Sequence, residues 1–433
     1  MKKGPKFIYK EKLSNGLIVL IHEMPWAQSV TARLVVKAGP RYENKKNIGT
    51  AHYLEHMLLE GSSKYPTRKE LDKAIEIQGG THNAYTNKEY VMYQIKMPPE
   101  SASLTLKFLY EIVFHPLISN EAVLREKGII SEELRMSLDN PNNHIWNLLL
   151  NFAWKNHPLG YNTLGTFDSI QALTKNDLMM YHQTFYVPNN AILIISGNIE
   201  TRKALDMVMK EFNKLKKKGS FQSVSTPKLI VSMPRVHIEE SDIKQSHILL
   251  SFSTQSYGKS SSLSLAIQLL SELNSKNIFY RLVYDLGLSY SAYCWPWLFS
   301  DTGLIAIYAG TNSKHTEKVV ETIVHEVNNL KINKKNVHEA KASLKKNLTL
   351  DLADSDDYAH FIGEQQLFKN NVYTPEEIKD KIDTVSIDTL IYLKNFILKK
   401  NNATMVVLGP VLKKATLLEK KLKTGFKSVP QKF

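Results

Sequence analysis

The chain has 433 residues, 43% of them hydrophobic, and a formal net charge of +14 at pH 7. This length allows two or three domains, and no apolar run approaches the roughly 18 residues that a membrane-spanning helix needs. Cys294 is the only cysteine, so no intramolecular disulfide can form, and without a signal-peptide pattern we expect a cytoplasmic protein. The lysines are spread along the chain without interleaved aromatic residues, so we expect neither nucleic-acid binding nor membrane insertion.

The first informative segment of the chain is a strand followed by a helix. Residues 29–39 are rich in β-branched and apolar side chains and end at a Gly-Pro pair, which predicts a buried strand. Apolar residues then recur at helical spacing up to about Gly61, which predicts a partly buried helix with Thr50 as its N-cap. A metal site on such a helix would be held rigidly.

The predicted helix carries the sequence His52-Tyr-Leu-Glu55-His56. Histidines at positions i and i+4 lie on one face of a helix and can bind the same metal ion. Glu55 stands beside that face, where a carboxylate can take a proton from a metal-bound water. The pattern is H-x-x-E-H, the inverted form of the zinc-peptidase signature. Without further context, the same residues could be two surface histidines on an ordinary helix.

A third metal ligand is predicted in the helical segment 126–136. Glu126 and Glu133 are seven residues apart, which is two helical turns, so they share a face. We expect Glu133 to bind the metal ion, and we expect Glu126 to accept a hydrogen bond from a ligating histidine. Spacing alone does not exclude Glu132, and a solvated acidic helix face is the plainer interpretation of the segment taken by itself.

An internal repeat predicts the architecture. IQALT at residues 170–174 recurs as IDTVS at 382–386, and NNA at 189–191 recurs at 401–403, so each pair is 212 residues apart. Each copy mixes strands with helices in both hairpin-like and crossover arrangements, which predicts an α+β fold made of two homologous halves. The Lys/Ser/Pro-rich stretch between the copies is the predicted linker.

The repeat gives three predicted regions: residues 1–220 as the metal-binding catalytic domain, 221–235 as the linker and 236–433 as a metal-free domain. At the same offset, the positions that correspond to the two histidines and to Glu133 carry no set of metal ligands. We therefore expect one metal ion per chain.

The motif and the residues around it resemble the pitrilysin/insulinase-type zinc metallopeptidases, a family that includes the mitochondrial processing peptidase subunits. Besides the motif and Glu133, the resemblance extends to LSNG at residues 13–16, GPRYE at 39–43, GGTHNAYT at 79–86 and the segment from Gly165 to Gly197. It implies two α/β-sandwich halves that close like a clamshell around a peptide.

The resemblance also implies roles for individual residues. His52, His56 and Glu133 would bind Zn²⁺, and Glu55 would act as the general base. Asn83 and Ala84 would offer their backbone to an extended substrate, which adds as a strand to the edge of a sheet. An ordinary Gly-Gly turn followed by a strand is the plainer interpretation of that last segment.

One departure from the family pattern concerns the second half. Similar enzymes place an Arg and a Tyr seven residues apart there, to bind substrate and stabilise the oxyanion. Tyr290 fits the Tyr, but Val283 stands where the Arg is expected, and the nearest arginine is Arg281. Family members form homodimers, or heterodimers with a metal-free subunit that carries this pair. We therefore expect a zinc endopeptidase acting on peptides or unfolded segments, or alternatively a non-catalytic or partner-dependent subunit of a heterodimeric assembly.

Overall fold

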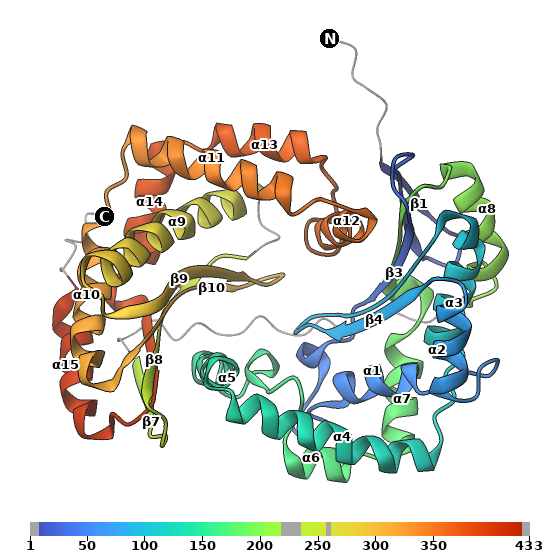
Figure 1. Cartoon of the computed structure of the whole chain (residues 1–433), viewed down its shortest axis with the longest axis horizontal. Coiled ribbons are helices and arrows are strands. Elements are labelled where there is room, and N and C mark those ends of the chain that lie inside the picture. The colour runs from blue at the N-terminus through green and yellow to red at the C-terminus, as the bar shows by residue number, and fades with distance from the viewer. Residues whose placement is uncertain (1–7, 218–234, 257–260, 427–433) are drawn as a thin grey trace. The chain divides into compact units, whose positions relative to one another are not determined.

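The computed structural model describes residues 8–217, 235–256 and 261–426. Its contacts divide the chain into two compact units: Met1–Met136, His157–Ser225 and Leu350–Thr374 form the first, and Ser137–Asn156, Thr226–Thr349 and Pro375–Phe433 form the second. Each unit contains one mixed β-sheet with helices packed against it (Figure 1). This organisation confirms the predicted α+β fold with two homologous halves.

The first unit is built on a six-stranded sheet in the order β1-β2-β6-β3-β5-β4. Strands β2 and β6 are parallel, and the other neighbours are antiparallel. The strands are β1 (Ile8–Lys12), β2 (Ile18–Glu23), β3 (Val30–Val36), β4 (Thr81–Thr86), β5 (Val91–Met97) and β6 (Ala191–Gly197). The helices are α1 (Thr50–Leu59), α2 (Arg68–Glu76), α3 (Ala102–Phe114), α4 (Asn120–Asp139), α6 (Phe167–Ala172), α7 (Lys175–Phe185), α8 (Thr201–Phe212) and α12 (Ser355–Lys369).

Both faces of this sheet are covered, which explains why all seven residues of β3 are buried. Leu34 and its alternate neighbours on β3 point into a large core shared with α1 and α3. Val35 points the other way, into a smaller core with Ala359 and Ile362 of α12. Figure 1 shows α12 and α3 on opposite sides of the strands.

The second unit repeats this plan with the sheet order β7-β11-β8-β10-β9, in which β7 and β11 are the parallel pair. The strands are β7 (Arg235–Glu239), β8 (Gln245–Thr254), β9 (Ser289–Leu298), β10 (Gly303–Asn312) and β11 (Ala403–Leu408). The helices are α5 (Pro141–Ala153), α9 (Ser261–Phe279), α10 (Thr316–Asn329), α11 (Lys334–Leu350), α13 (Pro375–Thr384), α14 (Ile387–Ile397) and α15 (Ala415–Gly425).

The two repeats exchange equivalent helices. Helix α5 comes from the first half of the chain but packs on β8 and β11 of the second unit, whereas α12 comes from the second half and packs on β3 and β6 of the first. The offset of 212 residues places α5 opposite residues 353–365, which include most of α12. Dividing the chain at one point therefore does not separate the two units, because each consists of three segments. The predicted linker, residues 221–235, lies almost entirely outside the described residues, so that boundary stays a prediction.

Candidate metal centre

Helix α1 carries the H-x-x-E-H motif, and its N-terminus is held by a carboxylate from the segment that precedes it. The N-cap is Gly49, with φ of 91°, and not Thr50, which is the first residue of the helix. A Cβ atom at position 49 would lie 2.8 Å from the Cα of Gly165, so only glycine fits this left-handed position. The buried Glu43 accepts hydrogen bonds from the backbone N–H groups of Gly49 (2.8 Å) and Ala51 (2.7 Å), in the role predicted for the Thr50 side chain.

Three of the predicted residues converge at the side of this helix. The Oε2 atom of Glu133, on α4, lies 3.6 Å from Nε2 of His52 and 3.4 Å from Nε2 of His56. Two ligand atoms at tetrahedral positions around one zinc ion lie about 3.4 Å apart. Glu132 is exposed and forms an ion pair with Arg135, so the geometry selects Glu133 from the two alternatives.

The donor set fits zinc. Two imidazole nitrogens and one carboxylate oxygen lie within 4.8 Å of one another, and they form the only such cluster of three His, Cys, Asp or Glu residues in the described parts of the chain. Three protein ligands of this kind leave a fourth tetrahedral position for water, as catalytic zinc sites do.

Glu126 orients one of the histidines. Its buried carboxylate lies 3.0 Å from Nδ1 of His56, which leaves Nε2 of that ring facing Glu133. The guanidinium of Arg125 approaches the other oxygen of Glu126, with 3.8 Å between Nε and Oε1. The position of Glu126 agrees with the one predicted for it from the helical spacing.

The two histidines differ in their affinity for protons. Burial, together with the neighbouring His56, lowers the pKa of His52 to about 4. Burial also disfavours the charged form of His56, but its hydrogen bonds to Glu126 and Glu133 outweigh that effect and raise its pKa to about 9. The hydrogen bond from His56 in turn lowers the pKa of Glu133. Without a metal ion, the cluster therefore holds one proton on His56 at neutral pH.

Glu55 is buried and is held by a residue for which the sequence predicted no role. Its Oε2 atom accepts a hydrogen bond from the Thr86 hydroxyl, with 2.6 Å between the two oxygens. Burial raises the pKa of Glu55, and the bond from Thr86 opposes that rise. The sequence did contain a signal for the position of Thr86. Side chains alternate between the two faces of a strand, so Thr86 lies on the same side of β4 as Ala84.

The strand that carries Thr86 lies at the edge of the sheet. Strand β4 pairs with β5 on one side and, among the described residues, with no strand on the other. Asn83 is exposed, and its side-chain oxygen accepts a hydrogen bond from the backbone N–H of Ala84 (2.9 Å). A peptide that pairs with this N–H group would have to replace the Asn83 side chain. Binding of substrate by Asn83 and Ala84 stays a prediction.

The two residues predicted in the other half belong to the second unit. Arg281 lies in a π-helical turn, where it forms ion pairs with Asp285 (3.2 Å) and Glu326 (3.7 Å). Tyr290 lies near the start of β9 and is 96% exposed. Arg281 is thus bound by acidic groups of its own unit, and the catalytic role of Tyr290 and the substrate-binding role of Arg281 both stay predictions.

Comparisons with known proteins identify peptidases among the relatives of this chain. The family profile "Insulinase (Peptidase family M16)" matches residues 18–167, and "Peptidase M16 inactive domain" matches residues 172–344. The chain is 28% identical over 383 residues to an uncharacterised zinc protease of Bacillus subtilis, covering 86% of this chain and 91% of the relative. It is 28% identical over 422 residues to the beta subunit of the mitochondrial-processing peptidase of Saccharomyces cerevisiae, covering 92% and 90%.

Solved structures share the fold. A protease from Helicobacter pylori superposes with a TM-score of 0.85 at 22% identity, over 93% of this chain and 99% of the other. Among the described residues, no helix combines the length and the apolar character that crossing a membrane requires.

Proposed function

Because the chain belongs to the insulinase family of peptidases (peptidase family M16), we propose that it is a zinc-dependent endopeptidase that cleaves peptides or unfolded protein segments. The observation that carries the proposal is the convergence of His52, His56 and Glu133, with the buried carboxylate of Glu55 on the same helix. Relatives named zinc proteases support the same conclusion.

His52, His56 and Glu133 would hold the zinc ion, one per chain. A zinc ion in this position supplies a Lewis acid that polarises the scissile carbonyl and lowers the pKa of water. Glu126 holds the ring of His56 so that its Nε2 atom stays available as a ligand. The donors come from α1 and α4, which are joined by side-chain contacts from Tyr53 to the backbone of Val123 and from His56 to Glu126.

Glu55 would act as the general base. The Thr86 hydroxyl bonds only Oε2 of this carboxylate, and Oε1 accepts no hydrogen bond from the described residues. The Oε1 atom can therefore receive a proton from the attacking water. The same carboxyl group then passes the proton to the nitrogen of the leaving amine. One residue thus serves as base in the first step and as acid in the second.

The substrate would bind as an added strand on β4. The edge of this strand, which pairs with no other described strand, would offer backbone groups at Asn83 and Ala84, while Thr86 on the same strand touches Glu55. Only an extended segment can pair in this way, so folded domains would be excluded. Substrate binding and catalysis would share one strand.

A second candidate concerns the assembly. Val283 replaces the arginine that similar enzymes carry, and Arg281 is held by Asp285 and Glu326. These observations favour a partner-dependent or non-catalytic subunit that works beside a related metal-free chain. The alternative assembly is a homodimer, which needs no second gene product. The catalytic alternative is favoured by the presence of the complete set of metal ligands and general base, because a structural subunit needs no general base. The set is His52, Glu55, His56 and Glu133.

The purified chain, analysed for zinc and incubated with a library of unstructured peptides, tests these alternatives. The proposal predicts one zinc per chain and cleavage that stops with a chelator and returns with zinc. A protein that holds zinc but cleaves nothing would indicate a missing partner subunit. A protein that neither binds zinc nor cleaves peptides would contradict the proposal.

A further inference from the structure

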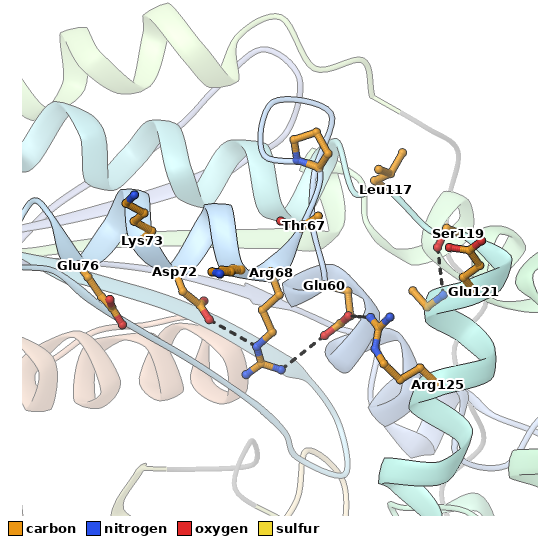
Figure 2. A pocket seen from close by; sticks show the side chains of 13 residues that line it. Glu60, Thr67, Arg68, Asp72, Lys73, Glu76, Leu117, Ser119, Glu121 and Arg125 are labelled. Atoms are coloured by element: carbon orange, nitrogen blue, oxygen red, sulfur yellow. Dashed lines mark hydrogen bonds and ion pairs between the residues drawn. The ribbon is translucent and has the colours of Figure 1, made fainter.

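A second feature of the first unit is a cavity of about 850 Å³ lined by α2, the end of α1 and the start of α4 (Figure 2). Ten of its 13 lining residues have polar or charged side chains, and two of them are arginines from different helices, Arg68 and Arg125. A volume of this size accommodates one or two amino-acid side chains with room for water. The charges in its wall decide which side chains it accepts.

The two arginines are held together by one buried carboxylate. Glu60 lies between them: its Oε1 atom is 3.6 Å from Nη1 of Arg68, and its Oε2 atom contacts Nη2 of Arg125. The Glu60 side chain is 6% exposed, whereas those of Arg68 and Arg125 are 50% and 55% exposed. Figure 2 shows both arginines reaching Glu60 from opposite sides.

The two carboxylates at the centre of the cavity are each paired on both oxygens, whereas the guanidinium groups keep further N–H donors. Both oxygens of Glu60 are engaged, and Asp72 is engaged by Arg68 (3.7 Å) and by His82 (2.8 Å). A guanidinium carries five N–H groups in a planar fork that matches a carboxylate, and each arginine uses only some of them here. Glu76 and Glu121 are exposed at the two ends of the cavity, with the arginines between them (Figure 2).

The cavity adjoins the edge strand. Asp72 in its wall bonds His82 on β4, next to Asn83. Thr86, beside Glu55, is four residues further along the strand, a distance of about 13 Å at the usual rise of a β-strand. A peptide paired with β4 therefore reaches the cavity about four residues from the bond that is cleaved.

We propose that Arg68 and Arg125 form a subsite for a carboxylate of the substrate, which lies about four residues from the cleaved bond. The carboxylate belongs either to an Asp or Glu side chain or to the C-terminus of the peptide. This inference rests on the proposed function, because it assumes that peptides bind along β4. It makes acidic or short peptides the preferred substrate class.

The test compares peptides that differ only in Glu or Gln at positions three to five residues from the cleaved bond, on either side, each with a free or an amidated C-terminus. The wild-type chain is expected to prefer the peptide with the carboxylate by about tenfold in kcat/KM, as a charge-assisted bidentate contact allows. Preference for Glu identifies a side-chain site, and preference for a free C-terminus identifies a terminal site.

Arg68→Gln is the test variant, because Arg125 also approaches Glu126. The variant is expected to lose most of the preference, so that its kcat/KM for the charged peptide falls to the level of its own kcat/KM for the neutral, amidated peptide. Because each variant is compared with itself, a general loss of activity or a lower melting temperature does not change this ratio. Arg202→Gln is the matched control, since Arg202 is an exposed arginine on α8, outside the cavity. Its preference is expected to equal that of the wild type.

Binding to the Glu55→Gln variant, measured by fluorescence anisotropy with the same labelled peptides, separates this inference from the proposed function. Preferential binding of the carboxylate peptide by Glu55→Gln supports the subsite if the double variant with Arg68→Gln loses that preference. This result supports the subsite even if the wild-type chain cleaves nothing. Equal binding of charged and neutral peptides, or a preference that Arg68→Gln leaves intact, overturns the subsite even if the chain is an active peptidase.

Discussion

The hydroxyl of Thr86 donates a hydrogen bond to the carboxylate of Glu55, with 2.6 Å between the two oxygens. Thr86 is the last residue of edge strand β4, and Glu55 lies in the middle of α1, so this bond joins the strand proposed to hold the substrate to the proposed general base. It fixes one oxygen of the carboxylate, and the other oxygen accepts no hydrogen bond from the residues that the structure describes.

We therefore expect Thr86→Val to lower kcat by about 10- to 100-fold, because the carboxylate loses the bond that orients it. KM, zinc content and melting temperature should change little, since valine has nearly the same shape as threonine. Thr86→Ser keeps the hydroxyl and should restore most of the activity. Steady-state kinetics of the three proteins measures this.

A double variant gives the control for that prediction. If Thr86 acts through Glu55, adding Thr86→Val to Glu55→Gln should lower the residual activity no further. A Thr86→Val enzyme with unchanged kcat, or additive losses in the double variant, would show that the bond has no role in positioning the base.

The adjacent residues Glu132 and Glu133 offer a matched pair for the metal ligand. Glu133→Gln should weaken zinc binding by at least about 100-fold, because a neutral amide replaces a charged ligand. Glu132→Gln should leave zinc binding unchanged, since the Glu132 side chain is exposed and paired with Arg135. Competition with a chromogenic chelator measures both affinities, and the opposite result would assign the ligand to Glu132.

Zinc binding should depend on pH through His56. The metal-free cluster holds a proton on His56, whose pKa is about 9, and a histidine must be neutral to bind zinc. The apparent zinc affinity should therefore rise by up to about tenfold per pH unit between pH 6 and 8, with close to one proton released from this residue at neutral pH. Titration calorimetry in buffers of different ionisation enthalpy counts the released protons, and release of none would contradict this picture.

Glu43 should make the stability of the first unit depend on pH. Burial raises its pKa from 4.5 to about 7, so the folded state keeps its proton where the unfolded state has lost it. The stability that Glu43 contributes is therefore fully present below pH 4.5 and is lost as pH rises towards about 7.

The Glu43→Gln variant isolates this contribution, because glutamine cannot ionise. The difference in free energy of unfolding between wild type and variant should fall as pH rises from 4.5 to 7 and level off above 7. Urea denaturation at several pH values measures it. A difference that stays constant or grows over that interval would show that Glu43 is ionised throughout.

The grouping of the candidate site residues was predictable from sequence because their key spacings are local. An i, i+4 pair and an i, i+7 pair fix which side chains share a helix face, so His52 with His56, and Glu126 with Glu133, could be grouped before the fold was known. Helical spacing could not choose between Glu132 and Glu133, because that choice depends on how α4 packs against α1.

Other features depend on contacts between distant segments. The bond from Thr86 to Glu55 depends on where β4 lies against α1, and the need for glycine at the N-cap of α1 depends on the close approach of Gly49 to Gly165. The repeat at an offset of 212 residues predicted two similar halves. It could not predict the exchange of α5 and α12, because periodicity does not say which sheet a helix covers.

Cleavage of one unstructured peptide by the wild-type chain and by Glu55→Gln, both loaded with one zinc per chain, tests the central claim most directly. The account predicts products from the wild type, and at least about a 1,000-fold slower reaction from the variant, whose zinc affinity and peptide binding are preserved. Equal rates from the two proteins would contradict the assignment of Glu55 as the general base and, with it, the proposed mechanism.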